Sequence, residues 1–190
     1  MSIGNRIDEA YIKVSLNDLE NALIQLSIAI DATAKKKFNG EKKVGKRIRL
    51  FIDEYEDLIT HFSMAGQLRI FAKEGTLYGD KGSLGDVVYK SIRCALLHEA
   101  DISDQVVFRN GQIQGMDNGK FIVTDQLLWG LLLILIGDQV NSKQKLKQQH
   151  KMNFNGVVLE LNDLWGNLGG IKKLTKYLSP EELGVPTFAK

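Results

Sequence analysis

The stretch Tyr89-Lys-Ser-Ile-Arg-Cys-Ala-Leu-Leu-His-Glu99 decides how the rest of this chain is interpreted. Its apolar residues are spaced like one face of an amphipathic helix, so we expect a helix over about residues 84–100. Two side chains inside it, Arg93 and His98, are not required for helix packing. Histidine is the side chain whose charge changes near neutral pH, and arginine is a permanently charged planar donor that matches a phosphate. Together they suit phosphodiester cleavage. The alternative is a structural role, in which His98 interacts with the dipole of a helix C-terminus and Arg93 bonds an acid on a neighbouring helix.

The geometry of a single helix keeps these two residues apart. Residues five apart are separated by about 140° around the axis and about 7.5 Å along it. Arg93 and His98 therefore converge only if the helix bends near His98 or if a second copy of the helix faces the first. A two-fold axis would supply that second copy and place two Arg and two His in one cleft.

The clearest helical pattern lies in residues 15–38, where we expect one long helix. Ser15 is a plausible N-cap, and Asn39-Gly40 is a plausible stop after three lysines that suit a helix C-terminus. The apolar seam follows alternating spacings of three and four residues: Leu16, Leu19, Leu23, Leu26 and Ile30.

Arg-x4-His on a helix, in a chain rich in helical patterns, resembles the HEPN superfamily (higher eukaryote and prokaryote nucleotide-binding). The stretch Asn21-Ala-Leu-Ile-Gln-Leu-Ser-Ile-Ala-Ile-Asp-Ala-Thr-Ala-Lys35 is similar to the first long helix of that fold, including an acid at Asp31. The similarity covers roughly residues 15–150. It implies a mainly α fold, an antiparallel bundle of four to five helices that forms a homodimer with RNA at the dimer seam.

The resemblance also implies a metal-independent endoribonuclease without a cofactor. His98 would take the proton of the 2′-hydroxyl that RNA has and DNA lacks, and Arg93 would stabilise charge on the phosphoryl oxygens. Asp31 or Glu99 would orient the imidazole or hold Arg93. A toxin or phage-defence effector, with a neutralising or regulatory protein partner, is the biological setting that this resemblance suggests.

A dense basic run surrounds the junction after the first helix. We expect four of its residues to contact the RNA backbone, although a solvated face is the alternative. These residues are Lys36, Lys43, Lys46 and Arg47.

Composition sets the general class of the protein. At 190 residues and 44% hydrophobic residues, the chain can bury a full core, and we expect a single domain over 1–190. The net charge of +2 is too small to indicate a nucleic-acid binder by itself. One cysteine, no apolar leader and no segment of roughly 18 apolar residues lead us to expect a cytoplasmic protein that does not enter a membrane.

The remaining patterns predict two more helices. One covers residues 43–62. The other covers residues 125–148, is capped by Thr124 or Asp125, and is apolar on every face in its first half. Between them we expect an inserted β-hairpin over about 104–123, with Asn110-Gly111 as its turn. A short α/β appendage is expected over about 152–190. We expect Trp129 and Trp165 to anchor the core or an interface.

Two alternatives to a metal-independent ribonuclease remain open. In the first, the chain is a non-catalytic module of the same fold that binds nucleotide, RNA or protein, since Cys94 follows Arg93 where members of the superfamily thought active often carry Asn, Asp or His. In the second, the chain is a metal-dependent hydrolase in which Cys94 and His98, four residues apart, hold a metal together with acids or with His61 or His150.

Overall fold

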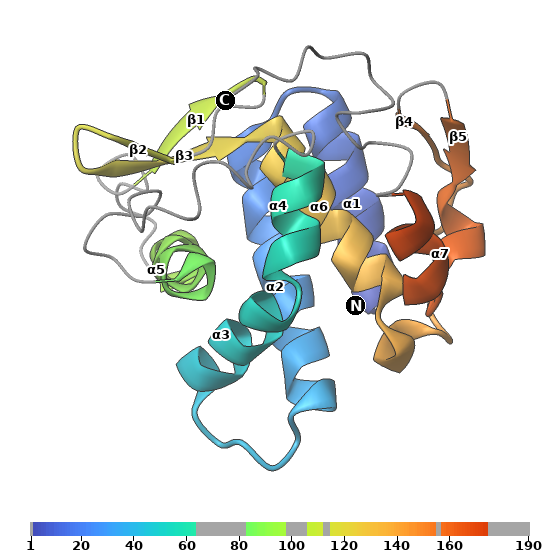
Figure 1. Cartoon of the computed structure of the whole chain (residues 1–190), viewed down its shortest axis with the longest axis horizontal. Helices are drawn as coiled ribbons and strands as arrows, with labels where there is room; N and C mark the ends of the chain where they lie inside the picture. Colours follow the sequence, from blue (N-terminus) through green and yellow to red (C-terminus); the bar gives the residue numbers. More distant parts are fainter. Residues whose placement is uncertain (1, 64–82, 98–105, 112–114, 155–156, 175–190) are drawn as a thin grey trace, which may run out of the picture.

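The computed structural model describes residues 2–63, 83–97, 106–111, 115–154 and 157–174. Within these ranges the chain is mainly α-helical, with small strand pairs and a C-terminal appendage, as expected (Figure 1). The helices are α1 Ile3–Ser15, α2 Leu19–Lys37, α3 Val44–Glu54, α4 Glu56–Ser63, α5 Leu84–Leu97, α6 Asp125–Gly137 and α7 Leu168–Leu174. The strands are β1 Val106–Arg109, β2 Gly115–Asp117, β3 Lys120–Thr124, β4 Lys151–Phe154 and β5 Val157–Glu160.

Helix α6 forms the centre of the molecule. It packs against α4, α2 and α1, and all of its residues from Gly130 to Gly137 are buried. Thr124 caps it, because its hydroxyl accepts a hydrogen bond from the Leu127 backbone N–H at 3.1 Å. The expected all-apolar buried helix and its Thr124 cap are thus confirmed, but the helix ends at Gly137 instead of residue 148.

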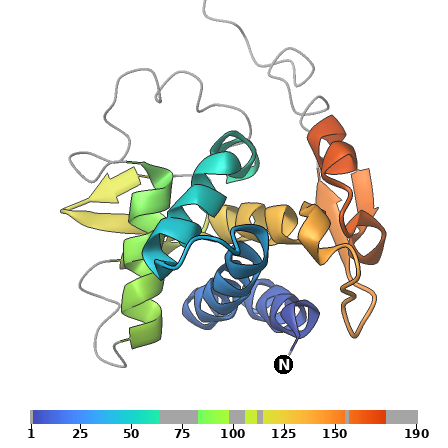
Figure 2. The same ribbon diagram turned by 90° about the horizontal axis from the view of Figure 1, so that it is seen from below.

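The other elements surround α6 in Figures 1 and 2. Helices α1 and α2 lie along one side of it and α4 along another, while α5 and the three-stranded sheet lie towards one end. The hairpin β4–β5 and α7 lie towards the opposite end. Among the described residues, none of the helices combines the length and apolar character needed to cross a bilayer.

The long helix expected over 15–38 is α2, which begins four residues later than expected, at Leu19, and ends at Lys37. Ser15 is the last residue of α1, not an N-cap, and the chain turns at Asn17, whose φ is 60°. Asp18 precedes α2, and Leu16 is 71% exposed, so the apolar seam begins only at Leu19. The seam from Leu19 onward is buried as expected, whereas α1 was missed.

The expected second helix is divided. Tyr55 ends α3, and α4 begins at the next residue, so the chain bends inside the predicted range of 43–62. Its apolar face is nevertheless buried, with Phe51, Ile52 and Ile59 fully enclosed.

The β-hairpin exists, but its turn is not the expected one. Strand β1 pairs in parallel with β3, so Asn110-Gly111 does not close a hairpin. The antiparallel pair is β2–β3, and the chain reverses at Asn118-Gly119, whose φ values of 49° and 78° suit a type I′ turn. The sheet order is β1-β3-β2.

Candidate functional site

The beginning of α5 is fixed by a reciprocal pair of hydrogen bonds. The Ser83 hydroxyl accepts from the Asp86 backbone N–H at 3.2 Å, and the Asp86 carboxylate accepts from the Ser83 backbone N–H at 3.4 Å. This is a capping box, which satisfies two backbone donors that a helix start would leave unpaired. The spacing Ser-x-x-Asp is visible in the sequence, but it was missed.

Helix α3 holds α5 through side chains on its second half. The Asp53 carboxylate accepts from the Ser83 hydroxyl at 3.0 Å and from the Gly85 backbone N–H at 3.2 Å. A Cβ at Gly85 would lie 2.3 Å from that carboxylate oxygen, so only glycine permits this approach.

Arg49 makes the next contacts along the same pair of helices. Its Nε donates to an Asp86 carboxylate oxygen at 2.6 Å, and its guanidinium lies 4.4 Å from the centre of the Tyr89 ring. Tyr89 in turn reaches Gly45, where an added Cβ would lie 2.6 Å from the tyrosine ring. Because Gly85 lies beside Arg49 and Asp53 while Tyr89 lies beside Gly45, α3 and α5 run antiparallel.

This antiparallel packing locates Arg93. The residue belongs to α5, one turn after Tyr89, so its part of the backbone lies near the beginning of α3. His98 and Glu99 lie outside the described residues, and the convergence of Arg93 with His98 therefore stays a prediction.

Asp31 and Arg47 meet near this corner of the molecule. Arg47 Nη2 is 3.5 Å from Asp31 Oδ1, and Arg47 Nη1 donates to the Glu41 carbonyl oxygen at 3.0 Å. Arg47 is only 8% exposed, so its guanidinium connects α2 to the start of α3 and offers little surface to a ligand.

The lysines around Arg47 are exposed. We call Lys42, Lys43 and Lys46, at the beginning of α3, the basic edge. Lys46 lies 2.8 Å from a Glu41 carboxylate oxygen, and the other oxygen accepts from the Lys43 backbone N–H at 3.0 Å. Lys46, followed by the Lys43 N–H, lowers the pKa of the Glu41 carboxyl. Lys36 is exposed near the end of α2.

A second charged cluster is buried where α2, α3 and α6 end. The Lys37 ammonium lies 2.6 Å from Glu54 Oε1, 2.7 Å from the Tyr55 hydroxyl and 2.9 Å from Asp138 Oδ2. The Tyr55 hydroxyl also donates to Asp138 Oδ2 at 2.7 Å. Nothing in the sequence pattern linked these residues.

The electrostatics of this cluster favour structure over catalysis. Burial lowers the pKa of Lys37, but the hydrogen bonds to Asp138, Glu54 and Tyr55 outweigh burial and raise that pKa well above its ordinary value. Burial, together with Asp138, raises the pKa of Tyr55 against the opposing effect of Lys37. Lys37 thus stays cationic and Tyr55 neutral at physiological pH, which suits neither a nucleophile nor a base.

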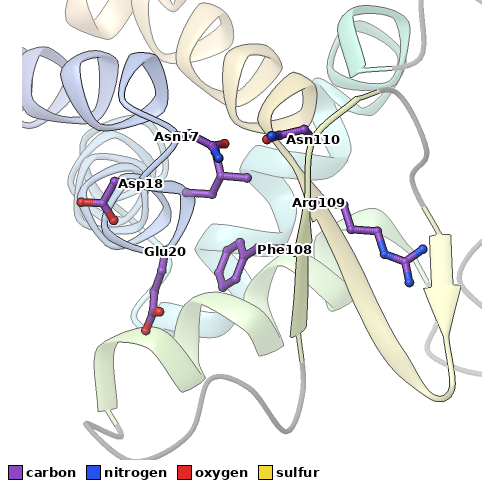
Figure 3. A pocket seen from close by; sticks show the side chains of 7 residues that line it. Asn17, Asp18, Glu20, Phe108, Arg109 and Asn110 are labelled. Atoms are coloured by element: carbon purple, nitrogen blue, oxygen red, sulfur yellow. The ribbon is translucent and has the colours of Figure 1, made fainter.

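A cavity lies between the start of α2 and strand β1 (Figure 3). It has a volume of about 300 Å³ and is lined by Asn17, Asp18, Leu19, Glu20, Phe108, Arg109 and Asn110. Phe108 points towards α2, whereas Arg109 points the other way, towards β2, and pairs with Asp117. With two acids and its arginine turned aside, the cavity is poorly suited to a phosphate.

Metal ligands do not cluster in the described part of the chain, where no three His, Cys, Asp or Glu side chains gather. His150, considered as a ligand in the sequence, is bonded to Asp8 at 2.9 Å.

Comparisons with known proteins identify one protein family that matches this chain. Neither the curated proteins nor the solved structures contain a match to this chain. The family described as Rv1289 matches residues 2–183, nearly the whole chain. The chain therefore belongs to the Rv1289 family.

Proposed function

We propose that this protein is a metal-independent endoribonuclease of HEPN type, with Arg93 and His98 as its catalytic residues. The observation that carries the proposal is the anchoring of α5. Its first half is fixed to α3 by Asp53, Arg49 and the capping box, and its second half, which bears Arg93, runs towards the basic edge.

The basic edge would bind the RNA backbone. Lys42, Lys43 and Lys46 are exposed, and each phosphate contact by a lysine adds an electrostatic contribution that salt weakens. An RNA strand bound along these lysines would approach the end of α5. Arg47, held by Asp31 and the Glu41 carbonyl, would keep the edge in place.

The reaction would use the RNA strand's own nucleophile. His98 accepts the 2′-hydroxyl proton, the oxygen attacks the adjacent phosphorus, and the bond to the 5′-oxygen breaks. Arg93 stabilises the charge that develops on the phosphoryl oxygens. The products are a 2′,3′-cyclic phosphate and a 5′-hydroxyl. A homodimer would bring the second Arg93 and His98 to the same cleft, and Glu99 or Asp31 would orient the imidazole.

The test is cleavage of single-stranded RNA in excess chelator. Wild-type protein should cleave, and Arg93→Ala and His98→Ala should each lose cleavage while keeping the wild-type circular dichroism spectrum and oligomeric state. If both variants cleave like wild type, or if chelator abolishes cleavage, the proposal is wrong. Relief by His98→Ala of toxicity during expression would support an effector role.

The basic edge has its own test. A Lys43→Ala/Lys46→Ala variant should bind RNA more weakly and with a shallower salt dependence, by roughly one unit of log–log slope per lost phosphate contact. Lys173, an exposed lysine on α7, provides the matched control, and Lys173→Ala should bind RNA like wild type. RNA binding without cleavage in the wild type would support the alternative, a non-catalytic module of the same fold.

A further inference from the structure

A second cavity lies away from α5, where α1, the beginning of α6 and strand β4 meet. Its volume is about 200 Å³. It is lined by Tyr11, Gln126, Trp129, Lys151, Met152 and Asn153. In Figures 1 and 2, β4 lies on the opposite side of the molecule from α5, so this cavity is separate from the proposed catalytic cleft.

Two partly exposed side chains of α6 lie at this cavity. After its first residue, every residue of α6 is buried except Gln126 and Trp129, and both of these line the cavity. A helix in the centre of the molecule would bury an aliphatic side chain at position 129 as readily as its neighbours. The half-exposed indole and the carboxamide one turn before it form a polar and aromatic opening in an otherwise apolar helix.

The aromatic wall is held rigidly. The Tyr11 ring meets Trp129 edge-on, with ring centres 5.2 Å apart, and stacks on His150 at 4.0 Å. The Tyr11 hydroxyl donates to the Lys151 carbonyl oxygen at 2.7 Å. Tyr11 is thus fixed on three sides, and its orientation is set before any ligand arrives.

His150 and Asp8 form the support behind Tyr11. The imidazole Nε2 lies 2.9 Å from Asp8 Oδ1, and the two side chains are 10% and 4% exposed. The segment that carries His150 follows α1 closely. A Cβ at Gly4 would lie 2.2 Å from the Lys145 carbonyl oxygen.

We propose that this cavity binds a single nucleobase. Aromatic rings stack on the face of any base, and a glutamine carboxamide offers a donor and an acceptor to the edge of a base. The volume is below the range of pockets for drug-sized molecules, which fits one ring system. Lys151, which lines the cavity, is 64% exposed and paired with Glu160, and it would attract the phosphate.

The base belongs either to a free nucleotide or to a single-stranded RNA. In the RNA case the inference rests on the proposed ribonuclease function, because the site would then hold substrate away from the cleft. In the free-nucleotide case it stands alone. The experiments below separate these two sources.

The first experiment uses the fluorescence of Trp129 in the full chain. The Trp165→Phe variant leaves Trp129 as the single tryptophan. Addition of AMP, GMP, CMP or UMP should quench its emission in a saturable way, whereas ribose 5-phosphate, which lacks a base, should not. Absence of quenching, or equal quenching by ribose 5-phosphate, would overturn the proposal. If a single-stranded oligonucleotide competes with the mononucleotide, the source is RNA, and if it does not, the source is a free nucleotide.

Variants test the assigned contacts. Gln126→Ala, at a half-exposed position, should weaken nucleotide binding, while Gln148→Ala at an exposed position is the control and should not. Trp129→Leu should weaken binding roughly 5- to 150-fold, measured by calorimetry. Unchanged affinity in both Gln126→Ala and Trp129→Leu would refute the site.

Arg93→Ala distinguishes the two proposals of function. It should leave mononucleotide binding unchanged, because α5 is remote from the cavity. If nucleotides bind and RNA is never cleaved, only the ribonuclease proposal fails. If RNA is cleaved and no nucleotide binds, only the nucleobase site fails.

Discussion

Replacing Lys37 by methionine should destabilise the protein by breaking the buried charged cluster. Asp138 is 1% exposed, and without Lys37 its carboxylate keeps, within the described part of the chain, the Tyr55 hydroxyl at 2.7 Å and the Val140 backbone N–H at 2.9 Å. A charge left in this state is costly, because burial has removed its water and its counter-charge is gone.

The expected magnitude follows from the geometry. At 2.9 Å and an effective dielectric constant of about 20, the Lys37–Asp138 attraction is about 6 kcal/mol before desolvation is subtracted. Removal of one partner from a fully buried pair costs about 3–5 kcal/mol. Since the Lys37 side chain is 20% exposed, we expect about 2–4 kcal/mol, or roughly 4–16 °C in Tm for a chain of this size.

The assay is chemical denaturation at pH 7 of wild type, Lys37→Met, Asp138→Asn and the double variant. The double-mutant cycle should give a coupling free energy of about 1–3 kcal/mol. Lys36→Met, an exposed neighbour, is the control and should stay within about 0.5 kcal/mol of wild type. A coupling free energy near zero, or a Lys37→Met variant as stable as its control, would refute the reasoning.

The remaining predictions concern pH and backbone. The pKa values of Lys37 and Tyr55 are raised in the folded state. Their contributions to the free energy of unfolding are therefore complete below the ordinary pKa values of 10.5 and 10.0, and they are lost as pH rises above these values. Wild type should therefore lose stability above about pH 10 more steeply than Lys37→Met/Tyr55→Phe, as measured by denaturation at pH 7 to 11. Gly85→Val should cost more than about 2 kcal/mol, because its Cβ would meet the Asp53 carboxylate, while Gly40→Ala, with open space around it, should not. Thr124→Ala should cost about 1 kcal/mol through loss of the α6 cap, and Thr124→Ser should restore most of it.

The sequence predicted features that depend on neighbours a few residues away. The apolar periodicity from Leu19 to Ile30 and the uniformly apolar stretch after Thr124 each fix which helix surface must leave water, wherever the helix lies. Composition and spacing suggest Arg93 and the basic lysines as candidates, and their role stays a prediction. They do not say which cations are used in ion pairs within the protein. Arg47 was expected to contact RNA, but it is buried and makes an ion pair with Asp31 within the bundle.

Tertiary structure decided what depends on distant partners. Asn110-Gly111 and Asn118-Gly119 carry the same turn chemistry, and only the pairing of β1 with β3 in parallel determines that the second one closes the hairpin. Lys37 and Asp138 are 101 residues apart, and Asp8 and His150 are 142 apart. Local sequence specifies backbone preferences through short-range sterics and hydrogen bonds, but the partner of a buried charge is determined by which helices share the core, and that is a property of the whole packed chain.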